Sequence, residues 1–382
     1  MSASTTVKLP TNLPQASDSG PAARGEAVRQ AEVKARFLPL DAYRGLIMLL
    51  LVSDGFGFSQ LPNRGIYHYI AEQFEHRPWG GAVFYDLIMP AFLFMVGVAM
   101  PFAFARRAEQ GAGSGETTRH VVVRSLRLIV ISQILVSIEL NRPHLQFHNV
   151  LTQVAATYLI CYFLMRLKPW QQVAAAAALL AFHSSIYFVF PGPDGPWAPV
   201  TNAGTRLDRW LMGGNYPWPA VNINFLSETP GVLFGVWVGH LLRSNRPRGE
   251  QLKILAISMV AAFASGLLLS PLVPINKWLW TASYTLYCTG WVMLGLIAFI
   301  LLVEYAGIRK PLFPLVVVGM NSLFIYCLHE LLGGGIDHAI SVFSRGYPFL
   351  GIFGPVAQAC SVLLVIWLIA WWMYRRGIFV KV

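Results

Sequence analysis

The chain has 382 residues, of which 55% are hydrophobic and 12% are charged, and its mean hydropathy is +0.53. A soluble domain carries roughly twice that charged fraction, so the charges are too few to cover a surface that faces water. These values exclude a soluble enzyme and a disordered scaffold, and they predict an integral membrane protein. The net charge of +11 is typical of basic residues that orient membrane segments, so nucleic acid is not an expected partner.

Residues 1–35 are rich in Ser, Ala, Pro and Gly and contain no apolar run. Such a segment can form neither a core nor the hydrophobic region of a signal peptide. We therefore predict a disordered cytoplasmic tail over residues 1–35.

About ten apolar stretches follow, each long enough to cross about 30 Å of hydrocarbon. Lipid permits helices or closed barrels, and continuous runs of this length are not the alternating strands of a barrel. The sequence therefore predicts an all-α fold, a polytopic membrane helix bundle of about ten transmembrane helices. The stretches lie near residues 40–58, 86–105, 120–138, 149–167, 171–190, 226–242, 252–271, 280–303, 312–332 and 354–374.

Basic residues are unevenly divided between alternate loops. If the N-terminus is cytoplasmic, most Lys and Arg lie in cytoplasmic segments, as the positive-inside rule requires. This pattern predicts a multi-pass protein of the cell inner (plasma) membrane with both termini in the cytoplasm. Trp79 and Trp197 then lie in outward loops, as part of an aromatic belt or as a platform under a sugar ring.

The usual signatures of metal and nucleotide chemistry are missing from the sequence. The cysteines fall inside predicted spans without a Cys-x-x-Cys pair, so we expect no disulfide, no zinc site and no metal cofactor. GxGxxG, Walker A, GxSxG and HExxH patterns are also missing, which removes the common soluble nucleotide-binding and hydrolase families. Chemistry must therefore come from polar groups in or near the membrane.

The first predicted span contains three ionisable residues, and each costs at least about 2.5 kcal/mol at mid-membrane depth. Asp41 and Arg44 are three residues apart on one helix face, where they can form a structural ion pair. Asp54 lies near the outer end with no basic residue within a turn. Gly55 and Gly57 follow it and permit a turn or the close approach of a ligand.

The loop after this span contains His76, which is followed by Arg-Pro-Trp-Gly-Gly. The rigid proline and the permissive glycines can hold an imidazole in place while a ligand approaches. Imidazole suits general-base catalysis near neutral pH. Asp86 precedes the second span, either as a helix cap or as a carboxylate that orients His76. His68 and Glu72 are expected to form a solvated structural pair.

A second polar group lies towards the C-terminus, where Asn321, His329 and Glu330 share one predicted span. Asn321 and His329 are eight residues apart, so both can face the bundle interior, although structural hydrogen bonding would also explain them. Asn276, Lys277 and Tyr284 lie on the outer side, where they are available to an acyl carrier or a glycan.

Five blocks occur in an order typical of one family: LDAYRG, FEHRPWGGAVFYDLIMPAFLFMVGVAM, PINKWLWTASYTLY, GMNSLFIYCLHE and YRRGIFVKV. Together they resemble the transmembrane acyltransferases related to heparan-alpha-glucosaminide N-acetyltransferase. The resemblance implies that residues 36–382 form a transmembrane acyltransferase domain. It also implies that acetyl passes from cytoplasmic acetyl-CoA to an amino sugar or other glycan on the extracytoplasmic side, with His76 at the position of the active-site histidine.

Three regions depart from the family pattern. Asp54 stands where the family typically has Asn. Gln146 and Gln153 replace arginines, and residues 222–225 replace an acidic Asp-Pro-Glu-Gly run. These changes concern CoA contacts and the identity of the acceptor more than the type of reaction.

We expect His76 to act as a general base or as a transient acyl acceptor, with Asp54 or Asp86 orienting its ring. The charged CoA would stay on the cytoplasmic side and thread its pantetheine arm into the bundle. Candidates for its phosphates are Arg106, Arg107, Arg124 and Arg127. Expected substrate-binding residues are Asp41, Arg44, Trp79, Asn276, Lys277, Asn321, His329 and Glu330.

Two alternatives stay open. Intramembrane Asp, Arg, His and Glu are also typical of a proton-coupled secondary transporter or flippase for a glycan or lipid intermediate, although the two halves share no repeated block. Within the enzyme class, O-acylation or a longer acyl chain would fit the same motifs. The expected partners are acetyl-CoA, the extracytoplasmic amino sugar or glycan and membrane lipid, and a homodimer is left open.

Overall fold

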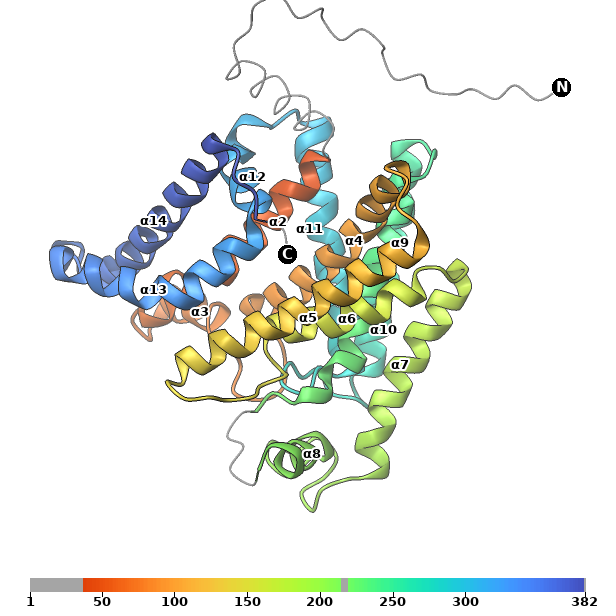
Figure 1. The fold of residues 1–382 in the computed structure, drawn as a ribbon. Coiled ribbons are helices and arrows are strands. Elements are labelled where there is room, and N and C mark those ends of the chain that lie inside the picture. The colour runs from red at the N-terminus through yellow and green to blue at the C-terminus, as the bar shows by residue number, and fades with distance from the viewer. Residues whose placement is uncertain (1–36, 214–218, 381–382) are drawn as a thin grey trace, which may run out of the picture. The chain divides into compact units, whose positions relative to one another are not determined.

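The computed structural model describes residues 37–213 and 219–380. The predicted tail over residues 1–35 lies outside the described residues. The described part of the chain is helical, without β-strands and with two isolated bridges, and Figure 1 shows the helices gathered in a bundle. The all-α class is therefore confirmed.

Helices occupy every predicted span, and their ends differ from the predicted ends by a few residues in most cases. The elements in chain order are α2 (Leu38–Leu51), η1 (Asp54–Gln60), α3 (Gly65–Gln73), η2 (Phe84–Leu87), α4 (Ile88–Glu109), α5 (Ser114–Glu139), α6 (Val150–Leu164), α7 (Pro169–Val189), α8 (Ala203–Met212), η3 (Asn222–Asn224), α9 (Phe225–Arg243), α10 (Arg248–Leu269), α11 (Ala282–Ile300), η4 (Leu301–Tyr305), η5 (Lys310–Leu312), α12 (Phe313–Met320), α13 (Ser322–Ser344), η6 (Pro348–Phe353) and α14 (Gly354–Arg376).

Six of the described helices are long and apolar enough to cross a membrane, and α12 with α13 forms a seventh, bent candidate. The six contain α4, α5, α7, α10, α11 and α14. Helices α2 and α6 have 14 and 15 residues, and α9 carries Glu228 and His240 among its 19. The polytopic bundle is confirmed, while the predicted count of ten exceeds the spans that qualify by length and apolarity.

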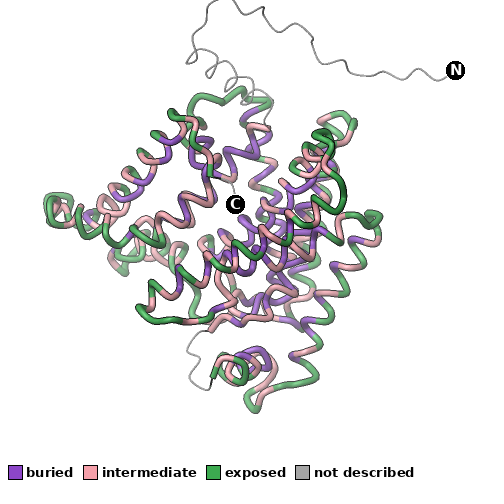
Figure 2. The backbone as a smooth tube through the Cα atoms, viewed as in Figure 1, coloured by how far each residue is buried: buried purple, intermediate pink, exposed green. Residues whose placement is uncertain are grey.

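Helices α4 and α9 pack closely because glycines remove side chains from their contact. A Cβ added to Gly97 of α4 would lie 2.0 Å from a backbone oxygen of α9, and one added to Gly235 would lie 2.2 Å from a backbone oxygen of α4. Gly235 and Gly239 repeat the small-xxx-small spacing that lets membrane helices approach. The α4 span is 61% buried, against 11% for α10. In Figure 2 the buried residues gather in the middle of the bundle and the exposed residues on its outer turns. Helix α4 is thus central, and it begins directly after the segment that carries Asp86.

The predicted span over residues 312–332 is broken at Asn321, where α12 and α13 meet at 71°. The prediction of one continuous helix here was wrong. Arg44 Nε donates to Gly319 O over 2.8 Å, and Asn321 Nδ2 donates to Ile378 O over 3.0 Å. Asn321 Oδ1 also accepts from the Val380 amide at 3.0 Å. The Arg44 bond satisfies a carbonyl that the helix break would otherwise leave unpaired in lipid, and the Asn321 bonds join the break to the segment after α14.

Replacing Gly235 by Ala should loosen α4 from α9, because even a Cβ overlaps the facing backbone. Overpacking of this kind costs about 1–3 kcal/mol, so the thermal midpoint of the detergent-purified protein should fall. Gly335→Ala is the matched control, since a Cβ there meets no atom within 4 Å. Fluorescence-detected size exclusion after heating measures both variants, and equal midpoints would contradict the close packing.

Candidate active site

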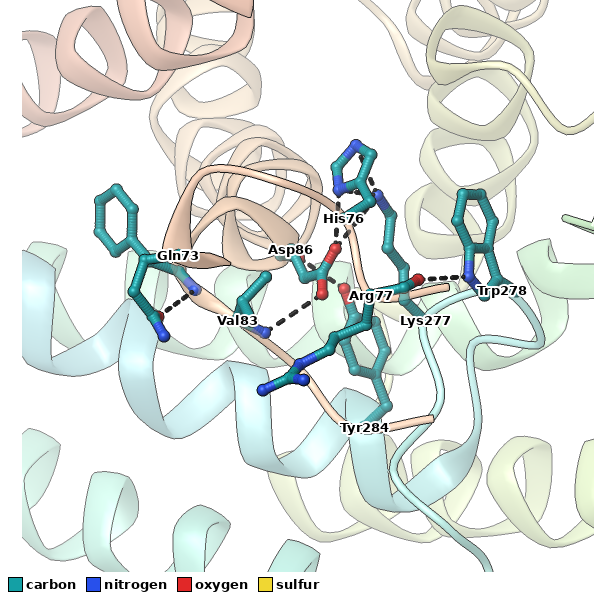
Figure 3. A network of polar contacts seen from close by, with 9 residues as sticks. Gln73, His76, Arg77, Val83, Asp86, Lys277, Trp278 and Tyr284 are labelled. Carbon is teal, nitrogen blue, oxygen red and sulfur yellow. Dashed lines mark hydrogen bonds and ion pairs between the residues drawn. The ribbon is translucent and has the colours of Figure 1, made fainter. Parts of the chain in front are cut away.

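His76 lies in the loop between α3 and η2, and this loop is bonded to a segment far away in the sequence. The Gly81 amide donates to Ile275 O over 2.7 Å. Trp278 Nε1 donates over 2.9 Å to the backbone oxygen of Arg77, 201 positions away. The loop after α10 is therefore held against the His76 loop, as Figure 3 shows for Arg77 and Trp278.

His76, Asp86 and Lys277 form one polar cluster. His76 Nδ1 lies 2.8 Å from Asp86 Oδ1. Lys277 Nζ lies 2.7 Å from Nδ1 and 2.9 Å from Nε2 of the same ring, and 3.3 Å from Asp86 Oδ1. The His76 side chain is 38% exposed while that of Asp86 is fully buried. The ring is therefore accessible to a ligand, and the carboxylate that holds it is not (Figure 3).

Two backbone interactions fix Asp86. Its Oδ2 accepts from the Val83 amide at 3.1 Å, and its backbone oxygen accepts from the Tyr284 hydroxyl at 2.5 Å. Asp86 thus caps the start of its own helix and contacts His76, which combines the two roles considered for it from the sequence. An ionised carboxylate only accepts hydrogen bonds, so the His76 proton belongs on Nδ1 and the lone pair is on Nε2, the nitrogen that Lys277 Nζ contacts at 2.9 Å.

Lys277 has an amine that is largely buried, which changes its pKa. Burial lowers the pKa of its amine from 10.5 to about 8, although the nearby Asp86 charge acts in the opposite direction. The Trp278 ring centroid lies 5.0 Å from Lys277 Nζ, and the Tyr85 ring centroid lies 4.8 Å from that of His76. These aromatic walls reduce access of water and strengthen charge interactions inside the cluster.

Asp54 lies outside this cluster. In the described part of the chain its ion-pair partner is His329, at 3.4 Å, and 80% of its side chain is exposed. The alternative in which Asp54 orients the His76 ring therefore has no contact to support it, whereas Asp86 makes that contact. His329, which was expected to face the interior as a substrate residue, has a side chain that is 14% exposed and contacts Asp54.

Three other predicted residues make structural contacts. Asp41 and Arg44 form the predicted ion pair at 2.9 Å, which is confirmed, and Arg44 also binds the end of α12. Trp79 Nε1 donates to Trp197 O over 3.0 Å. The exposed pair of His68 and Glu72 is likewise present, at 3.7 Å.

The remaining predicted residues lie apart from the cluster. Asn276 is buried, and its Oδ1 accepts from the Leu279 amide at 3.1 Å within its own turn. Asn321 binds the C-terminal segment, and Glu330 is exposed. Among the outward-loop residues predicted to bind substrate, Lys277 is the one that joins His76.

Apart from Asp54, the regions that depart from the family pattern meet in one uncharged network through Gln146, Gln153 and Asn222. Gln153 Nε2 donates to Phe147 O over 2.7 Å and to Asn222 O over 3.2 Å. Asn222 Oδ1 accepts from the Phe147 amide, and Gln146 Nε2 lies 2.8 Å from His148 Nε2. Neutral amides at these positions therefore join α6 to η3 without an ion pair.

A narrow cavity of about 120 Å³ runs along α4. Its lining includes Arg44, Arg124 and Tyr158, and the Arg124 guanidinium lies 4.7 Å from the Tyr158 ring centroid. Arg124 Nε is buried without a hydrogen-bond partner among the described residues. The cavity reaches Phe92, about 9 Å along the helix from Asp86 at 1.5 Å per residue. The side chains of Arg44 and Arg124 give this cavity a positively charged wall.

Residues 37–213 and 219–380 contain no group of three or more His, Cys, Asp or Glu side chains that could hold a metal. Sequence reasoning did not single out Tyr85, and it placed Tyr284 only in the outer region. The sequence spacing of these tyrosines does not show that Tyr85 lies against His76 or that the Tyr284 hydroxyl donates to Asp86 O. Both contacts depend on how the helices pack.

Comparison with known proteins finds similar sequences in one family. Residues 36–212 match the family model described as heparan-alpha-glucosaminide N-acetyltransferase, catalytic. Heparan-alpha-glucosaminide N-acetyltransferase of Mus musculus is 24% identical over 368 residues, covering 77% of this chain and 53% of that protein. The Homo sapiens protein of the same name is 23% identical over 428 residues, covering 93% of this chain and 61% of that protein.

The chain thus spans between half and two thirds of the length of these curated relatives, 53% and 61%. The match to the family model covers the His76 loop, Asp86 and α4. The resemblance inferred from the five sequence blocks, to the transmembrane acyltransferases related to heparan-alpha-glucosaminide N-acetyltransferase, is therefore confirmed.

Proposed function

We propose that the protein is a membrane-embedded acyltransferase that moves an acetyl group from cytoplasmic acetyl-CoA to an amino sugar or other glycan on the extracytoplasmic side. The observation that carries this proposal is the His76–Asp86–Lys277 cluster. A partly exposed imidazole is held by a buried carboxylate and contacted by a cation, which is the combination that acyl transfer needs.

His76 acts as the general base. Asp86 holds the proton on Nδ1, so Nε2 can take a proton from the acceptor amine as the amine nitrogen attacks the thioester carbonyl. The new carbon–nitrogen bond forms, the carbon–sulfur bond breaks, and the proton on Nε2 passes to the departing CoA thiolate. Acetylation of His76 itself, followed by transfer, uses the same arrangement in two steps.

Lys277 stabilises the negative charge that develops on the thioester oxygen. Its Nζ lies 2.9 Å from His76 Nε2, so an ammonium there is beside any carbon that the base directs an amine to attack. A preformed cation in a site shielded from water stabilises such an oxyanion strongly.

The cavity along α4 supports the route of the donor. Arg124 and Arg44 in its wall suit the phosphates of CoA, and its otherwise apolar lining suits the uncharged pantetheine arm. Acetyl-CoA is the expected donor, and no metal takes part in the steps assigned to these residues.

A broken membrane helix such as the one bent between α12 and α13 is also typical of transporters. This bend favours the second candidate function, a proton-coupled transporter or flippase. The two candidate functions predict different activities for the purified protein. Acetyl-CoA hydrolysis or transfer by protein in detergent supports the acyltransferase, and transport of glycan without either reaction supports the second candidate.

His76→Ala should lower acetyl transfer by about 100-fold or more, the usual contribution of a general base, without changing the amount of folded protein in the membrane. Asp86→Asn keeps the side-chain shape but removes the charge that holds the ring, so its loss should be smaller. Radiolabelled acetyl transfer by purified variants measures both. Full activity of His76→Ala would refute the assignment.

The pH profile should depend on Lys277. Below pH 8 the amine is mostly protonated, and as the pH rises through about 8, the pKa of Lys277, the cation is lost and activity should fall. Lys277→Arg keeps its charge over this range because a guanidinium stays protonated. The activity that remains in this variant should show no fall near pH 8. A fall at the same pH in both proteins would show that another group causes it.

The side of the membrane that His76 faces can be tested with cysteine labelling. Arg77 is exposed, so Arg77→Cys in a Cys360→Ser background should react with an impermeant thiol reagent applied to intact cells. Arg107→Cys, at the opposite end of α4, should react only after permeabilisation. The reverse pattern would overturn the proposed orientation.

A further inference from the structure

A cavity of about 440 Å³ lies between α2, η2, α4 and α11, and it shares no lining residue with the narrow cavity along α4. Small-molecule sites commonly have volumes of about 300–1,000 Å³. Its lining residues come from within residues 43–50, 82–91 and 287–299, together with Gln73. None of the steps assigned to His76 uses this space.

The wall of this cavity is mostly apolar. In the described part of the chain its lining contains no Lys, Arg, His, Asp or Glu. The Tyr43 hydroxyl donates to Val292 O over 3.2 Å, and Gln73 Oε1 accepts from the Phe84 amide at 3.1 Å. Two of its polar side chains thus bond the protein's own backbone. Because a polar ligand would lose hydrogen bonds to water here, the cavity is complementary to a hydrocarbon chain.

One edge of the cavity faces the outside of the bundle. Trp291 and Leu294 of α11 are 41% and 39% exposed, and Ala298 is also exposed. Residues three, four and seven positions apart share one helix face, so these side chains form a continuous apolar edge. They lie in the middle of a span that is long and apolar enough to cross a membrane. Lipid is therefore the solvent that meets this edge.

The cavity is elongated, and its end away from η2 is closed. The lining on α11 runs from Tyr287 to Phe299, which is about 18 Å along the helix at 1.5 Å per residue. One leaflet contributes about 15 Å, half of the hydrocarbon thickness. At the closed end the ring centroids of Tyr43 and Phe299 lie 5.1 Å apart, and the Tyr43 hydroxyl leaves no space for a Cβ on Gly295. The length of the cavity matches one hydrocarbon chain of one leaflet.

The other end of the cavity reaches the segment that holds Asp86. Val83 and Leu87 both line the cavity. The Val83 amide donates to Asp86 Oδ2 over 3.1 Å, and Asp86 Oδ1 lies 2.8 Å from His76 Nδ1. A chain in the cavity would pack against this segment, so its binding would stabilise the turn that positions the carboxylate.

We propose that this cavity is a lipid-binding site that takes one fatty acyl chain of a membrane phospholipid, which enters past the exposed edge of α11. The wall selects the chain and not the headgroup, because no charged side chain belongs to the described lining. The bound chain supports η2 and, through Val83, the carboxylate of Asp86. This site is separate from the donor and the acceptor of the proposed reaction.

Photolabelling of the purified full-length protein tests the site. The probe is phosphatidylethanolamine with a diazirine in one fatty acyl chain, added in detergent, and mass spectrometry identifies the labelled residues. Ile47 and Ile88 line the cavity and are 2% and 5% exposed, so lipid on the outer surface does not reach them. We expect label on these two residues, and label confined to exposed residues overturns the proposal.

Two substitutions at the exposed edge should hinder entry of the chain. Ala298→Phe and Leu294→Trp add bulk at exposed positions, where the fold should tolerate it. Label inside the cavity should fall by roughly tenfold, the equivalent of about two methylene groups kept out of it. Ala264→Phe and Leu268→Trp on α10 are the matched controls, since both positions are exposed and outside the cavity lining. Equal label in the edge variants and their controls overturns the proposal.

Other occupants predict different results. A native mass of two chains for the parent and of one chain for Ala298→Phe would assign the edge to a second copy. Displacement of the probe by decanoyl-CoA, but not by unlabelled phosphatidylethanolamine, would assign the cavity to a long acyl donor. Either result overturns the proposal. A phosphatidylglycerol probe with the same chain should label Ile47 and Ile88 equally, and a dependence on the headgroup overturns selection by the chain.

The support of η2 has its own measurement. Phosphatidylethanolamine should raise the thermal midpoint of the lipid-stripped parent, because a ligand that binds the folded state stabilises it. The rise should be smaller for Ala298→Phe than for Ala264→Phe. An equal rise in these two variants would overturn the stabilising role of the cavity.

Discussion

Two hydrogen bonds, from the Gly81 amide to Ile275 O and from Trp278 to the backbone of Arg77, hold the loop after α10 against the loop after α3. The proposed chemistry depends on them, because they bring Lys277 to His76 from the other half of the chain. Both bonds involve backbone groups. Both loops also contain residues with positive φ, Gly80 and Gly81 in one and Trp280 in the other. The site therefore forms only when α4, α10 and α11 have packed.

The buried carboxylate of Asp86 explains why the cluster has three members. A lone charge buried at this depth would be costly, and breaking a buried pair typically destabilises a protein by about 3–5 kcal/mol. His76 and Lys277 share one carboxylate oxygen while Val83 satisfies the other. The burial that lowers the Lys277 pKa to about 8 also makes its charge effective, so stability and proposed catalysis have the same physical origin.

Irregular backbone in this protein is consistently bonded by nearby groups. The break at Asn321 is bonded by Arg44 and by the C-terminal segment. The left-handed turn at Asp54 is held between the His76 loop and α14. Because lipid offers no water to unpaired amides and carbonyls, such breaks persist only beside polar partners.

Hydropathy alone determined the helices, since an apolar run of this length has few other structures in lipid. Local spacing determined the Asp41–Arg44 pair, and motif order indicated His76 and Asp86. Tertiary structure alone decided that Asp54 meets His329, that Lys277 reaches both nitrogens of His76, and that the span at Asn321 is bent. Each of these joins segments distant in the chain or depends on a partner that another helix supplies. Hydrophobic periodicity describes what one helix buries, and it contains no information on which distant polar group will lie beside it.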